Sequence, residues 1–453
     1  MKLDVDAFAR GQRAGVAYDL TGGVAGDAVA AGEHAPWVEV GEVLGEGVEA
    51  AATALQEVLA GAFETLRKCV EPGPALGEVG LAGAEAQAQG AKLRVGLMLP
   101  YTGAYAPLGV AIENGFRMAI NEQGGKLAGR EIEWFKVDDE SEPSKGIENA
   151  NKLVQRDKVD VLIGTVHSGV QMGIQKVARD SGVLSLIPNA GVHAATRALC
   201  APNVFRTSFS NSQPTLALGQ AMVAKGHKKA VWITWKYAAG DEAYEGFKES
   251  YIKAGGTIVK ELGLPFPNVE FQALLTEIAA LKPDAVACFF AGPSGAKFMK
   301  DFAAAGLKGK IALYGSGFLT EGVLEAAGPA ADGVMTTLHY SDSLDTPRNN
   351  KFRLEYAKAF KMQPDVYAVQ GYDTGLLLIQ GANAVKGDLS KKPELYKAME
   401  GAVIDSPRGK WTMSKSHNPV QDIYLRVAEK GENKVIGVAA KALADPGTGC
   451  RMG

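Results

Sequence analysis

The sequence predicts an α/β protein with two doubly wound, mostly parallel sheets. From residue 92 onward, short apolar runs alternate with segments of helical periodicity, which is the pattern of repeated βα units. The alternation pauses at residues 205–212, where small polar residues gather, and a second series of βα units follows. With 453 residues, the chain is also longer than one ordinary hydrophobic core requires. Two sheet domains are therefore expected.

The first series of βα units begins at residue 92. Residues 95–99 are an apolar run that predicts a buried strand, and Pro100 ends this strand because proline lacks a backbone donor. A helix is predicted from about Val110, since apolar side chains recur at helical spacing as far as Gly124 and Gly125. Further strands are predicted at 132–137, 159–166 and 183–187, with helices starting near residues 143 and 170. Tyr101 and Tyr105 therefore follow the end of a strand, where open α/β sheets bind ligands.

The second series starts after the pause. Strands are predicted at 230–234, 257–262, 285–290, 311–314 and 334–338, with helices at 241–254, 270–281 and 295–305. Three helices follow, at 347–360, 367–385 and 393–399. The chain is predicted to end in a hairpin of strands 423–428 and 434–439 around Gly431.

Composition and spacing disfavour several classes of function. The formal net charge is −3 and the basic residues are scattered, so nucleic acid is not an expected partner. The cysteines show no Cys-x-x-Cys spacing and the histidines are dispersed, so neither a structural zinc site nor a cofactor is expected. The acidic cluster at residues 138–142 lacks the spacing of a calcium loop and is better explained as a solvated helix N-terminus. No stretch approaches the roughly 18 to 20 uninterrupted apolar residues that span a bilayer.

Three cysteines in the globular part have separate interpretations. Cys288 lies inside an apolar run and is expected to be a buried small hydrophobe. Cys200 and Cys450 both lie in loop-like sequence. They either form a disulfide that ties down the C-terminal tail or remain two free thiols.

Residues 1–91 do not fit the rest of the chain. They are dominated by Ala, Gly, Val and Glu, with one convincing helix near residues 47–69, which is too little for a core. Residues 1–20 lack the basic start and apolar centre of a secretory signal, yet residues 82–91 have the small-residue character of a signal cleavage region. We therefore expect a poorly structured extension. A leader with a misplaced start is the favoured explanation, and a real extension is the alternative.

Residues 92–453 resemble a known family. The resemblance rests on motifs that occur in order: GLMLPYTGAYAPLG, VDDESEP, VLIGTVHSG, LSLIPNAG, FRTSFSN, ALKPDAV, AAAGLKG and YAVQGYDTG. The chain resembles the type I periplasmic solute-binding proteins of ABC importers, in the branch that binds branched-chain amino acids. The resemblance implies two lobes joined by three hinge crossings, which close around a ligand. The lobes it implies are residues 92–208 plus 339–405 and residues 209–338 plus 406–453.

The resemblance also implies where a ligand carboxylate would bind. Members of the family hold it with a hydroxyl and backbone N–H groups after two successive strands of the first lobe. These positions fall here on His167, Ser168 and Gly169, and on Asn189, Ala190 and Gly191. Both segments end a strand and lead into a helix, where free N–H groups favour an anion. The alternative for Ser168 is an ordinary helix N-cap.

The members that bind amino acids place an acidic residue in the second lobe against the ligand ammonium. That position aligns here with Gly317, and an ammonium without a carboxylate partner would be poorly paired in a closed site. Aromatic side chains are expected in its place, and they suit a planar aromatic acid. The candidates are Tyr101, Tyr105, Trp235, Tyr237, Phe318 and Tyr340. Side chains alternate along a strand, so only one of Phe289 and Phe290 can face the site, and we assign Phe290 together with Ala291. For each aromatic residue, packing in the core is the alternative.

We therefore expect a monomeric, periplasmic binding component of an ABC importer that acts with membrane permease subunits. Its expected ligand is a small organic acid, in particular an aromatic carboxylate of the benzoate or phenylpropanoid type. A binder of branched-chain amino acids or amides is the alternative within this class. Two different classes of function are also considered, the sensor of a signalling system and an α/β enzyme. An enzyme is disfavoured because His167 and Ser168 are adjacent on an extended segment, and no G-x-S-x-G motif is present.

Overall fold

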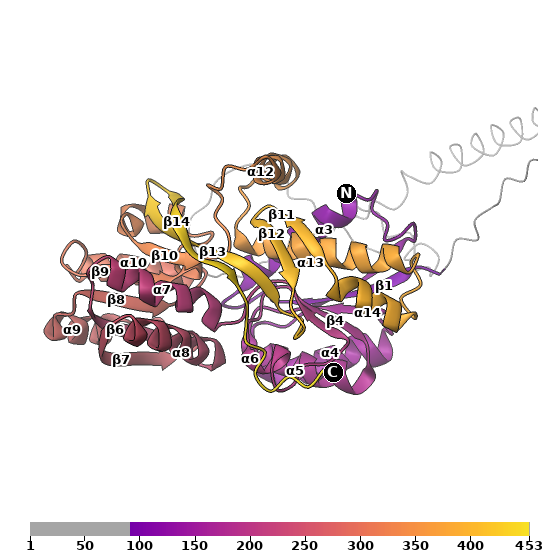
Figure 1. Cartoon of the computed structure of the whole chain (residues 1–453), viewed down its shortest axis with the longest axis horizontal. Helices are drawn as coiled ribbons and strands as arrows, with labels where there is room; N and C mark the ends of the chain where they lie inside the picture. The colour runs from indigo at the N-terminus through magenta and orange to yellow at the C-terminus, as the bar shows by residue number, and fades with distance from the viewer. Residues whose placement is uncertain (1–90, 453) are drawn as a thin grey trace, which may run out of the picture. The chain divides into compact units, whose positions relative to one another are not determined.

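The computed structural model describes residues 91–452 (Figure 1). The predicted N-terminal extension, its helix at 47–69 and the leader hypothesis lie outside the described residues. Among residues 91–452, no helix is both long and apolar enough to cross a membrane.

The first sheet is parallel throughout and has the strand order β2-β1-β3-β4-β5. Its strands are β1 (Leu93–Leu99), β2 (Ile132–Asp138), β3 (Val161–Ile163), β4 (Leu184–Ile187) and β5 (Val204–Arg206). The helices of this series are α3 (Ala106–Asn121), α4 (Gly146–Asn151), α5 (Ser168–Ser181) and α6 (His193–Thr196). We call this sheet with its helices the first lobe. The strand order reverses between β1 and β3, and ligands bind at such switch points in open α/β sheets.

The second sheet has the order β11-β12-β13-β10-β9-β8-β6-β7. The neighbours from β10 to β7 are parallel. These strands are β6 (Lys229–Lys236), β7 (Thr257–Pro265), β8 (Ala285–Phe289), β9 (Ala312–Ser316) and β10 (Met335–Leu338). Their helices are α7 (Ser212–Ala224), α8 (Ala238–Lys253), α9 (Gln272–Leu281), α10 (Pro293–Ala304) and α11 (Leu324–Ala327). We call these parallel strands with their helices the second lobe.

The last part of the chain joins the two groups of strands. It contains α12 (Pro347–Phe360), α13 (Val366–Ala384), α14 (Lys392–Glu400), β11 (Val403–Ser406), β12 (Gly409–Met413), β13 (Pro419–Glu429) and β14 (Glu432–Leu443). In Figure 1, the long strand β13 runs between the first-lobe strands and β10 of the second lobe, with which it pairs antiparallel. Helix α13 packs closely on α3. A Cβ atom at Gly371 would lie 2.0 Å from the carbonyl oxygen of Ile112, so only glycine permits this approach.

The prediction of an α/β protein with two mainly parallel sheets is confirmed, and so is the buried position of Cys288. Some element predictions differ from the structure. Helix α3 begins at Ala106 rather than near Val110, and β5, β11 and β12 were not predicted as strands. These strands have only three to five residues, which is too short to show a clear period of two in the sequence.

The C-terminal tail returns to the first lobe. Cys200 and Cys450 form a disulfide, and the Arg197 guanidinium pairs with the Asp445 carboxylate at 2.8 Å. The sequence-based division assigned the whole tail to the second lobe. The structure instead ties the end of the tail to the loop around α6.

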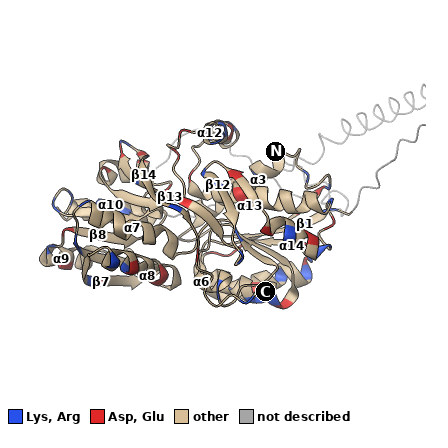
Figure 2. Cartoon of the chain, viewed as in Figure 1, with Lys and Arg blue, Asp and Glu red and all other residues tan. Residues whose placement is uncertain are grey.

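Positively and negatively charged positions are interspersed along the described helices and strands (Figure 2).

Candidate functional site

A small cavity lies where the two lobes meet. Its empty space is about 300 Å³, including the part open to solvent. The lining residues come from both lobes and from the segments that join them: Tyr105, Leu108, Val166, Ser168, Asn189, Gly191, Phe209, Asn211, Tyr237, Ala239, Phe289, Ala291, Phe318 and Tyr367. None of them carries a formal charge.

The N-terminus of α5 forms one polar part of the cavity. Ser168 is the first residue of this helix, and its Oγ accepts a hydrogen bond from Asn211 Nδ2 at 3.3 Å. The hydroxyl proton of Ser168 therefore remains available to a ligand. The first N–H groups of a helix lack intrahelical partners and carry a partial positive charge, so this end of the cavity favours an anion.

His167 caps α5 and does not line the cavity. Its Nδ1 accepts a hydrogen bond from the Gly169 N–H at 3.1 Å, so this N–H is already used. Burial lowers the pKa of His167 to about 4, which leaves the imidazole neutral near pH 7. The ring stacks on Tyr237 with centroids 4.7 Å apart. His167 and Gly169 therefore hold the helix end in place, and Ser168 alone of the three lines the cavity.

The segment after β4 forms the other polar part of the cavity. Asn189 Nδ2 donates to Gln370 Oε1 at 2.7 Å, which fixes the orientation of its amide. The Ala190 N–H donates to the Thr165 carbonyl at 2.9 Å and is therefore occupied. Gly191 lines the cavity, and a Cβ there would lie 2.3 Å from Asn211 Oδ1. A side chain at residue 191 would therefore displace Asn211 and Phe209 from their positions in the wall.

Aromatic rings make up much of the remaining wall. They are Tyr105, Phe209, Tyr237, Phe289, Phe318 and Tyr367. Phe318 lies at the centre of the group. Its ring centroid is 4.7 Å from that of Phe209, 6.0 Å from that of Tyr367 and 6.4 Å from that of Phe289. These neighbours are tilted, stacked and edge-on in turn, and aromatic walls of this kind suit the insertion of another planar ring.

Two features of the tyrosines bear on ligand binding. The hydroxyls of Tyr105 and Tyr237 are 2.8 Å apart and form a hydrogen bond between the lobes. The Tyr367 side chain is only 1% exposed, and its hydroxyl has no hydrogen-bond partner among the described residues. A buried hydroxyl that faces a cavity without a partner is available to an oxygen atom of a ligand.

The structure brings part of the sequence-predicted site together. Tyr105, Ser168, Asn189, Gly191, Tyr237, Ala291 and Phe318 line the cavity. Tyr101, His167, Gly169, Ala190, Trp235, Phe290, Gly317 and Tyr340 do not. The assignment of Phe290 to the site was wrong, because side chains alternate along a strand and the structure turns Phe289 toward the cavity instead. Phe290 packs between Phe271 and Phe298 in the core.

The remaining residues outside the cavity have identifiable partners. Trp235 Nε1 donates to the Asn268 carbonyl at 2.9 Å, and the Tyr340 hydroxyl donates to Asn349 Oδ1 at 3.1 Å. The ring of Tyr101 lies 3.6 Å from the Lys136 ammonium. These three side chains are thus directed toward structural partners.

Gly317 is enclosed rather than open to the ligand. Its carbonyl accepts a hydrogen bond from Arg426 Nη2 at 2.9 Å, and a Cβ on Gly317 would lie 2.4 Å from Leu338 Cβ. Arg426 in turn pairs with the buried carboxylate of Glu321. The position aligned with the ammonium-binding acid therefore has no room for a side chain.

Sequence reasoning missed several lining residues: Leu108, Val166, Phe209, Asn211, Ala239 and Tyr367. Phe209 and Asn211 lie in the motif FRTSFSN, and Tyr367 lies in YAVQGYDTG. Both motifs contributed to the family resemblance. Phe209 and Asn211 follow β5, which was not predicted as a strand, and Tyr367 lies on α13 rather than after a strand, so neither position was recognised as part of the site. In residues 91–452, no group of three or more His, Cys, Asp or Glu side chains is arranged to hold a metal ion.

Comparison with protein families gives one match over most of the globular part. The model of a family described as periplasmic binding protein matches residues 92–433. Among curated proteins, the chain is similar to Leu/Ile/Val-binding protein homolog 6 of Brucella melitensis biotype 1. The two are 31% identical over 370 residues, which cover 78% of this chain and 93% of the relative.

Two solved structures are similar over their whole length. One is an ABC transporter solute-binding protein from R. palustris in complex with benzoate. It is 53% identical, with a TM-score of 0.78, and the match covers 80% of this chain and 100% of that one. The other is a solute-binding protein from Rhodopseudomonas palustris BisB5 in complex with 3,4-dihydroxybenzoic acid. It is 32% identical, with a TM-score of 0.75, and the match covers 79% of this chain and 99% of that one.

Proposed function

Because this chain belongs to the periplasmic binding protein family, we propose that it captures a small aromatic carboxylate of the benzoate type for an ABC importer. The observation that carries this proposal is the uncharged cavity with aromatic walls at the N-terminus of α5. The relative that was solved with benzoate supports the same class of ligand. Binding and lobe closure are then the whole activity, without a cofactor or a chemical step.

In this proposal, the ligand carboxylate lies against the Ser168 hydroxyl and the backbone N–H groups near Ser168 and Gly191. The helix terminus supplies positive potential there, so no basic side chain is needed. The ring lies among Phe209, Phe289 and Phe318. Each favourable contact between two rings contributes about 0.5–1.5 kcal/mol beyond area burial.

The second candidate ligand is a branched-chain amino acid, which the name of the Brucella relative favours. An α-ammonium in this cavity would face no carboxylate, because none of the described residues that line the cavity is an Asp or a Glu. The enclosed position of Gly317 also argues against an acid at the aligned site. Aromatic acids without an ammonium avoid this unpaired charge.

The family also supports a place and partners for the protein. We propose that it acts in the periplasm as a monomer and delivers its ligand to membrane permease subunits. Closure then moves one lobe against the other. The first lobe is built from residues 92–208 plus 339–405, and the second from residues 209–338 plus the strands that follow residue 405. The tail from Asp445 onward stays with the first lobe.

A thermal-shift screen of the full chain tests the ligand class. We expect benzoate, hydroxybenzoates or cinnamate to raise the melting temperature, because a ligand that binds only the folded state stabilises it according to its affinity. Leucine and valine should have no effect. Stabilisation by leucine instead of benzoate would support the second candidate. An unchanged melting temperature with every one of these compounds would contradict both candidates.

Calorimetry on Ser168→Ala tests the proposed carboxylate site. Loss of a hydrogen bond to a charged group costs about 1.5–3 kcal/mol, so the Kd for benzoate should rise roughly 10- to 100-fold. Ser181→Ala is the matched control. Ser181 ends the same helix, and its hydroxyl donates to the Val177 carbonyl at 2.7 Å, away from the cavity. Equal losses in the two variants would show that Ser168 supports the helix and does not bind the ligand.

A further inference from the structure

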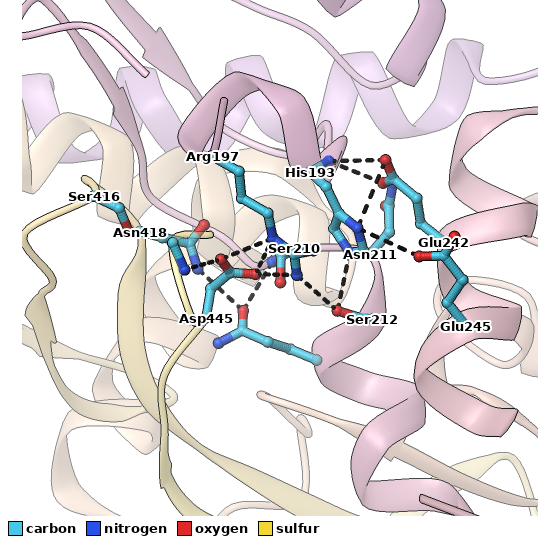
Figure 3. Close-up of polar contacts among 12 residues, drawn as sticks. His193, Arg197, Ser210, Asn211, Ser212, Glu242, Glu245, Ser416, Asn418 and Asp445 are labelled. Carbon is cyan, nitrogen blue, oxygen red and sulfur yellow. Dashed lines mark hydrogen bonds and ion pairs between the residues drawn. The ribbon is translucent and has the colours of Figure 1, made fainter. Parts of the chain in front are cut away.

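A polar network connects the two lobes beside the cavity (Figure 3). It joins α6 of the first lobe, the segment at residues 210–212, α8 of the second lobe and the C-terminal tail. The labelled residues are His193, Arg197, Ser210, Asn211, Ser212, Glu242, Glu245, Ser416, Asn418 and Asp445. Glu242 contacts α6 of the other lobe and also Asn211, which lines the cavity.

The Glu242 carboxylate accepts hydrogen bonds from two N–H donors, one in the first lobe and one at the start of α7 in its own lobe. Its Oε2 lies 2.9 Å from the backbone nitrogen of His193, at the start of α6, and its Oε1 lies 3.1 Å from the same nitrogen. Oε2 also accepts from Asn211 Nδ2 at 2.8 Å. Because Glu242 is on α8, separation of the lobes would break the contact with His193.

Asn211 carries this contact to the ligand cavity. It lines the cavity, and the nitrogen that donates to Glu242 also lies 3.3 Å from Ser168 Oγ. An ionised carboxylate can only accept hydrogen bonds, and the carbonyl oxygen of a protonated carboxyl also accepts, so Glu242 directs the amide nitrogen of Asn211 toward itself in either state. Ser168 in turn is left with its proton free for the ligand. The orientation of two cavity residues thus depends on the carboxylate of Glu242.

We propose that Glu242 is a positioning residue that couples closure of the lobes to the arrangement of the ligand cavity. The inference rests on the proposed function, since it assumes that closure accompanies ligand capture. In the closed form, Glu242 holds Asn211 and through it Ser168. In the open form, its carboxylate loses the His193 N–H and returns to water.

Protonation of Glu242 supplies a measurable signature of this coupling. Burial is the main cause that raises its pKa from the ordinary 4.5 to about 7 in the structure. Because opening exposes the carboxylate, its pKa should return to the ordinary value in the open form. Closure of the lobes should therefore take up a proton when the pH lies between 4.5 and about 7. Closure is then favoured at low pH, and this contribution is lost as the pH rises through about 7.

Several other charged groups face the same region. Their contribution to the pH dependence of binding must be separated from that of Glu242. They are His193, Glu245, Arg197, which is paired with Asp445, and Arg206. Burial lowers the pKa of His193 to about 3, so its titration on closure has the opposite sign. Comparing two variants at the same pH cancels the contribution of His193, because both variants contain it.

The test is calorimetry with benzoate on the full chain, for the wild type and Glu242→Gln, at pH 6 and pH 8. With pKa values of 4.5 and about 7 in the open and closed forms, the ratio of variant Kd to wild-type Kd should fall about tenfold from pH 6 to pH 8. Glu245→Gln is the matched control. The Glu245 side chain is on the same helix but is 70% exposed. The ratio of the Glu245→Gln Kd to the wild-type Kd should therefore stay near one at both pH values.

The possible outcomes separate the two proposals. If Glu242→Gln changes the Kd by the same factor at both pH values, Glu242 is a structural residue and the inference is overturned. If the wild type binds no benzoate, the proposed function fails and the inference fails with it. Should Glu242→Gln not fold, Glu242→Ala serves the same purpose, because it removes the titrating group and adds no donor.

Discussion

The Tyr105 hydroxyl lies 2.8 Å from the Tyr237 hydroxyl, and this hydrogen bond joins the residue before α3 to the residue before α8. The bond therefore links the first lobe to the second. Both tyrosines also line the cavity. One of the contacts between the lobes is thus part of the wall that a ligand would touch.

Replacing Tyr105 by Phe should weaken benzoate binding by roughly two- to tenfold, because the closed form loses one hydrogen bond worth about 0.5–1.5 kcal/mol. Calorimetry measures the change in Kd. Tyr251→Phe is the control, since its hydroxyl donates to the His227 carbonyl at 3.0 Å and Tyr251 does not line the cavity. An unchanged Kd in Tyr105→Phe would mean that the bond between the lobes does not favour the bound state.

Replacing Tyr367 by Phe should have opposite effects on stability and binding. The free protein buries the Tyr367 hydroxyl without a partner among the described residues, at a cost of about 1–3 kcal/mol, so its removal should raise the melting temperature. If the ligand supplies the missing partner, the same variant should bind benzoate roughly fivefold or more weakly. Thermal unfolding without ligand and calorimetry measure the two effects. A variant that melts lower and binds normally would contradict this role.

Replacing Gly317 by Asp should not create an amino-acid site. The new Cβ would lie 2.4 Å from Leu338 Cβ and 2.5 Å from Arg426 Nη2, so the backbone must shift. We expect a loss of about 1–3 kcal/mol in unfolding free energy and no binding of leucine. Gly437→Asp is the control, because a Cβ at Gly437 meets nothing within 4 Å among the described residues. A stable Gly317→Asp protein that binds leucine would refute the packing argument.

Removing the disulfide should lower stability and leave ligand affinity unchanged. Cys200 and Cys450 are 250 residues apart, so their bond restricts the unfolded chain strongly, and loss of a native disulfide typically costs about 2–5 kcal/mol. Neither cysteine lines the cavity. Denaturant unfolding of the Cys200→Ser/Cys450→Ser variant measures the loss. A reducing agent should destabilise the wild type but not this variant.

The local pattern of the chain was sufficient for the fold class and for part of the site. Alternating strand and helix periods reveal βα units, and the carboxyl ends of parallel strands converge at one edge of a sheet. This is why Tyr105 and Tyr237 could be selected from the predicted loops, whereas Ser168 and Gly191 came from the family resemblance, which places them after predicted strands. Each of these residues lies at or soon after the end of a predicted strand.

Only the tertiary structure decided the rest of the site. The direction of Phe289 or Phe290 depends on how β8 pairs with its neighbours, and the enclosure of Gly317 depends on Leu338 and Arg426. Asn211 and Tyr367 are brought to the cavity from a segment between the lobes and from α13. Periodicity within a segment reports which of its faces is buried. It carries no information about which distant segment covers that face, because packing between remote parts of the chain settles this.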